Sequence, residues 1–250
     1  MCSKMNDKIS AQEIVDNMRI GWNLGNSLEC PPPEKDNPSL EDYETSWECP
    51  ITTREMILTV IKAGFNTIRI PVTWGKLMLQ GSGYKINPAW LERVKEVVDY
   101  AYNEGVYVII NVHHEDDWLY LGNKEVEEKA KEILASFWVQ IAEYFKDYNE
   151  RLLFETMNET RLIGTDDEWT EGTPEARKVI NEFNEVAVRA IRSTGGNNLY
   201  RFILIKTIGA RYNVECIKDI VVPDNDKRVI LSIHVYVPYP FTMLPDCALR

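Results

Sequence analysis

The sequence has 250 residues, of which 44% are hydrophobic, 10% aromatic and 27% charged, an ordinary composition for a globular protein. It carries 28 Lys and Arg against 39 Asp and Glu, a formal net charge of −11. This acidic balance, with no basic block to offset it, argues against a nucleic-acid-binding protein. The lack of an apolar run of about 18 residues predicts no membrane-spanning helix. No linker or repeat divides the chain, so we expect residues 1–250 to form a single domain.

The five cysteines do not follow the spacing of a zinc-ribbon or thioredoxin-type site. They are Cys2, Cys30, Cys49, Cys216 and Cys247. Cys30 and Cys49 flank a proline-rich acidic segment, and two interpretations stay open for them: a disulfide, or free or buried thiols, which are the commoner case. Residues 1–7 are polar, so no signal peptide is visible; either a signal has been removed or the protein is intracellular.

The amino-terminal part predicts a helix, a short strand and a long loop before a second helix. These three segments are expected at residues 10–17, 18–23 and 30–49, the last because it holds four prolines and many acids. Thr52 and Glu55 have the spacing of a capping box, so the second helix is expected to have Thr52 as its N-cap. Gly64 follows the last apolar turn and is expected to end this helix.

The rest of the chain alternates predicted strands with predicted helices. The strands are expected at residues 66–71, 106–112, 152–157, 202–208 and 228–235. The helices are expected at residues 88–104, 124–148, 174–193 and 214–220, and the segment 238–250 is expected to be a loop. A helix between two strands returns the chain to the same end of the sheet, so the six strands are expected to be parallel. No phosphate-binding glycine loop and no G-x-S-x-G motif is present, which disfavours nucleotide-binding folds and a serine triad.

Polar residues gather where the predicted strands end. They are Asn23, Asn26, Arg69, His113, His114, Glu115, Asn158, Glu159, His234 and Tyr236. The carboxyl ends of parallel strands share one face of a barrel, and enzymes of this architecture place their active site there. A zinc site is the alternative that the histidines suggest. However, His113 and His114 are adjacent on a predicted strand and start on opposite faces, so no metal is expected.

Glu155 and Glu159 lie four residues apart at the end of one predicted strand, so both are expected on the same face of the sheet. Glu159 is at the end of the strand, within reach of a substrate. Glu155 is deeper, where an unpaired carboxylate would be costly. We therefore expect a charge contact between Glu155 and Arg69.

Five segments, in order and each at its expected strand, resemble glycoside hydrolase family 5 in its endo-β-1,4-glucanase (cellulase) branch. They are residues 21–28 (GWNLGNSL), 64–74 (GFNTIRIPVTW), 109–115 (IINVHHE), 153–159 (LFETMNE) and 234–236 (HVY). The resemblance covers nearly the whole chain from about residue 9. It implies a retaining enzyme of the α/β class, a (β/α)8 TIM barrel that needs no metal or other cofactor.

The resemblance also implies the roles of the catalytic residues. Glu159 would be the acid/base, which protonates the leaving glycosidic oxygen and then deprotonates the attacking water. Asn158 would hold the sugar 2-hydroxyl, and Arg69 would position the carboxylates and keep the nucleophile ionised. Tyr236 would hydrogen-bond the nucleophile.

The remaining positions would line the binding cleft. His113 and His234 would lie at the cleavage subsite. Glucan would be bound by Asn23, Asn26 and His114. Trp74 and Trp118 would be stacking platforms, although a place in the core is an equally good interpretation of each tryptophan.

The sequence departs from the family pattern in two places. The usual Asn-Glu-Pro reads Asn158-Glu159-Thr160, which frees the loop backbone but removes no chemical group. The family supplies its nucleophilic glutamate from the seventh strand and a platform tryptophan from the eighth, whereas this chain ends at Arg250, soon after the sixth predicted strand. We therefore expect a barrel truncated after about six βα units and without its nucleophile, since Asp246 is the sole acid in the last segment.

Three functional interpretations stay open. The first is a retaining endo-β-1,4-glucanase that acts on β-glucan and is inactive or feeble as truncated, with xyloglucanase, mannanase or xylanase activity as variants within the family. The second is a remnant that binds β-glucan without cleaving it, and the third and least favoured is a metal-dependent hydrolase. An open sheet edge would favour self-association. By the resemblance, the protein would be extracellular or at the cell surface.

Overall fold

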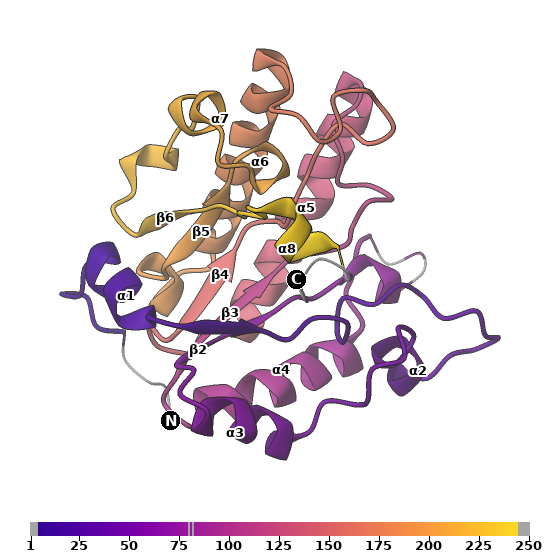
Figure 1. Cartoon of the computed structure of the whole chain (residues 1–250), viewed down its shortest axis with the longest axis vertical. Helices are drawn as coiled ribbons and strands as arrows, with labels where there is room; N and C mark the ends of the chain where they lie inside the picture. The colour runs from indigo at the N-terminus through magenta and orange to yellow at the C-terminus, as the bar shows by residue number, and fades with distance from the viewer. Residues whose placement is uncertain (1–4, 80, 82, 245–250) are drawn as a thin grey trace.

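A six-stranded parallel sheet forms the centre of the structure (Figure 1). The computed structural model describes residues 5–79, 81 and 83–244. The strands are β1 (Gly21–Asn23), β2 (Thr67–Ile70), β3 (Tyr107–Asn111), β4 (Leu152–Glu155), β5 (Ile203–Lys206) and β6 (Val229–Ser232). Each strand pairs in parallel with the next one along the chain. The predicted parallel sheet is therefore confirmed within these residues.

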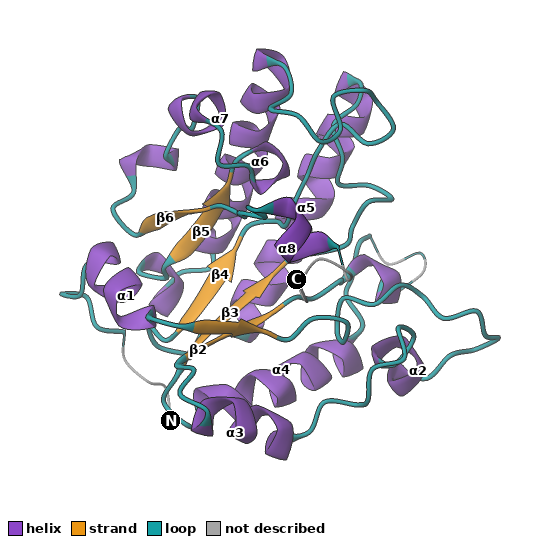
Figure 2. Cartoon of the chain, in the orientation of Figure 1, coloured by secondary structure: helices purple, strands orange, loops and turns teal. Residues whose placement is uncertain are grey.

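Helices lie before, between and after the strands, and those between the strands cover the outer face of the sheet (Figure 2). They are α1 (Ala11–Met18), α2 (Leu40–Glu44), α3 (Arg54–Lys62), α4 (Pro88–Tyr102), α5 (Lys124–Tyr144), α6 (Pro174–Ser193), α7 (Val214–Lys218) and α8 (Tyr239–Met243). Short 3-10 turns are η1 (Gly75–Leu77), η2 (Gly196–Leu199), η3 (Ile208–Ala210) and η4 (Pro223–Asn225). Ile68, Ile110 and Phe154 are buried in one core with apolar residues of α3 to α6. Because successive side chains of a strand point to opposite faces, the residues next to these three along each strand point to the inner face of the sheet.

The inner face of the sheet carries an apolar layer and then a polar layer. Ile109 and Leu153 pack in one cluster with Leu204 and with Ile14 of α1. Two residues further along the same strands, the side chains on this face are polar: Asn111, Glu155 and Lys206. The register pairs Asn111 with Glu155, and Lys206 with Ser232 of β6. The alternation of side chains therefore brings a row of polar groups together at the carboxyl ends of the strands.

The capping-box prediction for α3 is wrong by one residue. Thr53 is the N-cap, and its side chain accepts a hydrogen bond from the Met56 amide. Thr52 is instead buried, and its amide donates to the Glu44 carboxylate at 2.7 Å. The other end of the helix is as predicted, since Gly64 follows the C-cap with a φ of 104°. Glycine adopts this left-handed conformation without the strain that a Cβ would cause.

The segment 30–49, predicted as a loop throughout, contains helix α2. Ser39 caps this helix, and Asp42 completes a capping box with the Ser39 amide. The two groups satisfy backbone donors at the helix start, so five residues can form a helical turn in an otherwise irregular segment. Cys30 and Cys49 are free thiols, which excludes the disulfide interpretation for this segment.

Both outer strands are open within the described residues, since β1 pairs with β2 and β6 pairs with β5. Apolar side chains along and after β6 are exposed: Leu231, Ile233, Val235, Val237 and Tyr239. The chain then forms helix α8, where the sequence predicted a loop, and Asp246 lies outside the described residues. In the ranges that the structure describes, no helix is long and apolar enough to cross a lipid bilayer.

Candidate active site

A cleft of about 500 Å³ opens at the carboxyl ends of the strands. It is lined by nine residues that the sequence predicts for the site: Asn23, Asn26, Arg69, His113, His114, Asn158, Glu159, His234 and Tyr236. Gly25, Glu29 and Trp47 also line it. The prediction that Asn158, Glu159 and the three histidines lie at one end of the sheet is therefore confirmed.

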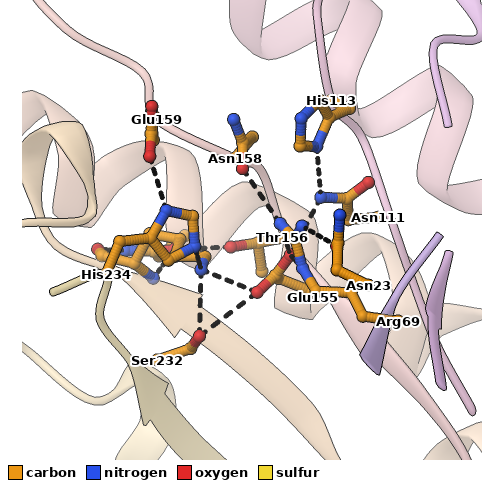
Figure 3. Close-up of polar contacts among 12 residues, drawn as sticks. Asn23, Arg69, Asn111, His113, Glu155, Thr156, Asn158, Glu159, Ser232 and His234 are labelled. Atoms are coloured by element: carbon orange, nitrogen blue, oxygen red, sulfur yellow. Dashed lines mark hydrogen bonds and ion pairs between the residues drawn. The ribbon is translucent and has the colours of Figure 1, made fainter. Parts of the chain in front are cut away.

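Arg69 and Glu155 form the predicted charge contact (Figure 3). Arg69 Nε and Nη2 donate to Glu155 Oε2 at 2.9 and 2.6 Å, and the Glu155 side chain is only 1% exposed. The guanidinium also donates to Asn23 Oδ1 at 2.8 Å and to Asn158 Oδ1 at 2.9 Å. Arg69 therefore connects β1, β2 and the end of β4, and it holds the amide oxygen of Asn158 so that the NH₂ group points away from the guanidinium (Figure 3).

Lys206 is a site residue that the sequence analysis missed. Its buried Nζ lies 2.7 Å from Glu155 Oε1, 2.9 Å from Ser232 Oγ and 2.9 Å from His234 Nε2. Burial alone would raise the pKa of Glu155, but the cations of Arg69 and Lys206 outweigh it and hold that pKa well below its usual range. The available signal was a single lysine at the end of an aliphatic strand, where it faces inward with Glu155.

The carboxylate of Glu159 is held from the β6 side of the cleft. His234 Nδ1 lies 2.5 Å from Glu159 Oε1 (Figure 3). The Tyr236 hydroxyl donates to the same oxygen at 3.5 Å. Burial would raise the pKa of Glu159, but His234 and then Lys206 bring it below its ordinary value. Tyr236, which the resemblance assigns to the nucleophile, thus has its hydroxyl beside Glu159.

His113 and His114 both line the cleft, and their ring centroids are 4.5 Å apart. The prediction of opposite faces is wrong because β3 ends at Asn111, so both residues lie beyond the strand, where alternation does not apply. His113 Nδ1 lies 3.0 Å from the Asn111 amide nitrogen, so it accepts that hydrogen bond. Burial and the Arg69 cation lower the pKa of His113 well below 6.5, which keeps the ring neutral at neutral pH. Within the described ranges, no three His, Cys, Asp or Glu side chains are grouped to hold a metal ion.

Neither predicted stacking platform lies in the cleft. Trp74 is fully buried, and its Nε1 donates to the Asn111 carbonyl at 2.8 Å, so the core interpretation is the correct one. Trp118 is partly buried, and its Nε1 donates to Glu115 Oε2 at 2.7 Å. Glu115 also accepts hydrogen bonds from the Trp74 and Gly75 amides at 2.5 and 2.9 Å. Glu115 and its indole donor therefore join the loops after β2 and β3 and do not line the cleft.

Trp47 is the exposed indole of the cleft, and the sequence analysis did not select it. It is 40% exposed and meets the His114 ring edge-on, with centroids 5.6 Å apart. It follows α2 within the segment that was predicted to be a surface loop. Tryptophan on a cleft wall offers a flat apolar face for a ligand ring.

A second hollow, of about 590 Å³, lies on the outer side of the barrel, against α4 and away from the strand ends. Its lining includes Lys95 and Asp99, which pair with each other at 2.5 Å, and Arg54, which pairs with Glu104 at 2.5 Å. Paired, partly exposed charges of this kind are typical of a solvated helix surface. We therefore place the candidate site in the smaller cleft, where buried ionisable groups meet.

Sequence comparisons identify related proteins over most of the chain. A model of the cellulase family (glycosyl hydrolase family 5) matches residues 32–246. The chain is 48% identical over 235 residues to a cellulase/esterase of Acetivibrio thermocellus, an alignment that covers 94% of this chain and 27% of that protein. It is 45% identical over 236 residues to endoglucanase B of Clostridium cellulovorans, covering 94% of this chain and 51% of the relative. The chain thus spans about a quarter and about half of these two curated relatives.

Solved structures resemble the fold closely. A broad-specificity endoglucanase of Clostridium longisporum has a TM-score of 0.89 at 45% identity, with 95% of this chain and 67% of that chain covered. An endoglucanase of Ruminococcus champanellensis with bound cellotriose has a TM-score of 0.89 at 40% identity, with 95% and 69% covered. These neighbours are (β/α)8 barrel enzymes, so the predicted barrel class is confirmed for the six parallel strands.

Proposed function

The chain belongs to glycosyl hydrolase family 5, and on this premise we propose that its cleft serves retaining endo-β-1,4-glucanase chemistry, with Glu159 as the acid/base. The observation that carries the proposal is the carboxyl group of Glu159 at the wall of the cleft, with Asn158 beside it and His234 against one of its oxygens. A retaining glycosidase needs such a group to protonate the leaving oxygen and then to activate water. We propose that residues 1–250 belong to one catalytic domain.

The polar layer supports specific roles for its neighbours. The Arg69 guanidinium has hydrogen-bond donors only and donates to the amide oxygen of Asn158. The Asn158 NH₂ group is therefore turned toward the cleft side, where it can donate to a sugar hydroxyl. Because Nδ1 of His113 accepts from Asn111, a neutral ring carries its hydrogen on Nε2 and can donate there without adding charge beside the oxocarbenium-like transition state. Glu155, tied to Arg69 and Lys206, is placed to keep the Arg69 guanidinium fixed.

The retaining reaction needs a second carboxylate, and two acidic residues of the site, Glu29 and Glu155, are candidates for it. Glu29 lines the cleft, but its oxygens accept hydrogen bonds from the Asn26 and Ser27 amides at 2.7 and 3.0 Å. Glu155 is buried beneath Arg69. We propose that residues 5–79, 81 and 83–244 do not include the nucleophile, and that efficient cleavage needs a carboxylate from elsewhere, about 5–5.5 Å from Glu159.

The substrate proposed is a β-glucan. Trp47 offers a ring face on the cleft wall, next to His114 and near the amides of Asn23 and Asn26. This combination of an apolar face with several polar groups suits sugar rings. The cellotriose bound by the Ruminococcus champanellensis relative supports a cellulose-like chain. A xyloglucan-specific relative from a metagenomic library, at 45% identity, favours xyloglucan as the second candidate, ahead of mannan or xylan.

Two further properties follow from the same proposal. Within the described residues, β6 has an open edge, with Leu231 exposed on the strand and Val235 and Val237 exposed after it. This edge is suited to pairing with another chain, so we propose self-association along it. Relatives that degrade polysaccharides act on a polymer too large to enter a cell, so we propose an extracellular or cell-surface location. Light scattering of the purified chain tests the first, and fractionation of the source cells tests the second.

The test of activity is reducing-sugar release from carboxymethylcellulose, xyloglucan and lichenan, together with calorimetric binding of cellotriose. Without the second carboxylate we expect the chain to show only feeble hydrolysis. We expect Glu159→Gln to lower this residual rate by up to about 10²–10⁴-fold while binding is kept, because general acid/base catalysis contributes that much. Glu185→Gln, on the exposed side of α6, is the matched control and should change neither quantity.

The outcomes separate the interpretations. Hydrolysis that depends on Glu159 supports the interpretation of the chain as a glucanase. Binding of cellotriose without hydrolysis by any protein preparation supports the glycan-binding alternative. Neither binding nor hydrolysis, or hydrolysis that survives Glu159→Gln unchanged, would overturn the proposed role of this cleft.

A further inference from the structure

The hydrogen bonds of Lys206 determine which groups around it are donors. An ammonium has three hydrogens and no acceptor, and Nζ has three oxygen or nitrogen neighbours within 2.9 Å: Glu155 Oε1, Ser232 Oγ and His234 Nε2. The Ser232 hydroxyl donates its own hydrogen to Glu155 Oε1 at 3.2 Å, so its oxygen accepts from Lys206. Each ammonium hydrogen therefore has one acceptor, and the third acceptor is His234 Nε2.

This assignment fixes the hydrogen on the His234 ring. When Nε2 accepts from Lys206, the ring hydrogen of the neutral imidazole is on Nδ1. Nδ1 lies against Glu159 Oε1, so His234 donates to that oxygen. A proton on Nε2 would place two donors against each other and would break the contact with Lys206.

We propose that Lys206 is a positioning residue of the catalytic site, which holds His234 in its Nδ1–H tautomer and so directs the acidic proton of Glu159 to Oε2. The inference rests on the proposed role of Glu159 as the acid/base. Oε1 already accepts from His234, and the Tyr236 hydroxyl also points to it, so the proton of the acid form is carried by the other oxygen. Figure 3 shows that second oxygen on the side of Glu159 turned away from His234. The proton then passes from Oε2 to the glycosidic oxygen, and the carboxylate remains.

The electrostatics around His234 agree with this arrangement. The charged or titratable groups near the ring are Lys206, Glu155, Glu159, Tyr236, Arg69 and His113. The pKa of Lys206 is lowered, chiefly by burial, while the Glu155 carboxylate at 2.7 Å acts in the opposite direction and favours the ammonium. A neutral amine at Lys206 could accept a hydrogen from Nε2, so the tautomer of His234 also reports the charge of Lys206.

The chain has three histidines, so its ring nitrogens can be resolved by NMR after ¹⁵N-histidine labelling. His234 is assigned by the signal that is lost in His234→Gln. We expect an unprotonated Nε2 and a protonated Nδ1 in the wild-type protein at neutral pH. In Lys206→Met the ammonium is lost while the chain length is nearly kept, and we expect Nε2 to take up a proton, because carboxylates remain on both sides.

Two controls keep the experiment decisive. Lys227→Met makes the same substitution at an exposed lysine and should leave the His234 signals in place. Ser232→Ala removes one acceptor but keeps the ammonium, so Nε2 should stay unprotonated. If Lys206→Met does not fold, the wild-type and Ser232→Ala spectra still decide: a proton on Nε2 in either one overturns the proposal. An Nε2 that stays unprotonated in a folded Lys206→Met protein overturns it as well.

These outcomes are independent of activity. If the hydrolysis and binding assays show no glucanase function, the acid/base role of Glu159 fails while the tautomer result stands. If Nε2 is protonated in the wild-type protein, the role of Lys206 fails while the proposed function is unaffected.

Discussion

Replacing Glu155 by glutamine should destabilise the protein strongly, because it removes the charge that compensates two buried cations. The carboxylate accepts hydrogen bonds from Arg69, Asn111 and Ser232 and pairs with Lys206. The side chain is 1% exposed and that of Lys206 is fully buried, so water cannot replace the lost charge. Glutamine keeps the size of the side chain, which isolates the electrostatic effect.

Removal of one partner of a buried ion pair costs about 3–5 kcal/mol. A loss of 1 kcal/mol lowers Tm by about 2–4 °C in a domain of this size, so Glu155→Gln should lower Tm by about 6–20 °C. The pKa of Glu155 is held below that of a free glutamate, 4.5, so the stabilisation is fully present above pH 4.5 and is lost as the pH falls below that value. The difference between wild type and variant should therefore be constant near neutral pH and shrink in acid.

Urea and thermal denaturation followed by circular dichroism measure this difference. The control is Glu185→Gln, which breaks an exposed pair with Arg189 at 2.7 Å whose side chains are 42% and 60% exposed. An exposed pair four residues apart on a helix contributes about 0.3–0.5 kcal/mol. The reasoning is refuted if Glu155→Gln loses no more stability than this control, or if its deficit grows as the pH falls.

Two other predictions concern Glu115 and its hydrogen bonds with Trp74, Gly75 and Trp118. Gly75→Ala should cost about 1–3 kcal/mol of unfolding free energy, because the new Cβ would overlap the Glu115 carboxylate. The control is Gly21→Ala, whose Cβ would meet Thr67 at 3.4 Å and which should cost less. Urea denaturation of both variants measures the difference. Burial raises the pKa of Glu115 to about 7, so its contribution to stability is complete below pH 4.5 and falls by up to about 3 kcal/mol as the pH rises to 7. Glu115→Gln should remove this slope, and a slope that is the same in both proteins would contradict it.

Most of the fold could be predicted because its signals are local. Helix α6 begins at Pro174 and ends at Ser193 as predicted, since Thr173 caps one end and Gly195 follows the other. The errors are also local: Thr52 and Thr53 both carry the hydroxyl that an N-cap needs, and only the path of the chain decides between them. Short helices such as α2 depend on a cap and on burial of one or two side chains, which the periodicity of five residues does not reveal.

Contacts of the candidate site could be predicted where a buried charge required a partner of opposite charge and the sequence offered one good candidate. Glu155 needed a cation, and Arg69 was the best candidate, two strands away in the sheet. Trp74 was left open between cleft and core because a tryptophan of either kind can follow a strand, and the difference is set by what covers the ring. Trp47 was missed because its place in the cleft depends on the course of a long irregular segment.

Lys206 shows most clearly what the sequence could not reveal. A lysine that ends an aliphatic strand is compatible with an exposed edge or with a buried site, and only the register with β4 and β6 decides. Once that register exists, the inner layer holds two cations, Arg69 and Lys206, and two carboxylates, Glu155 and Glu159. The His234 ring lies between Lys206 and Glu159. Such a layer is electrically balanced only as a whole. Removal of any one charge should therefore disturb groups that it does not touch, and the coupling between Lys206 and Glu159 through the His234 ring is the most direct case.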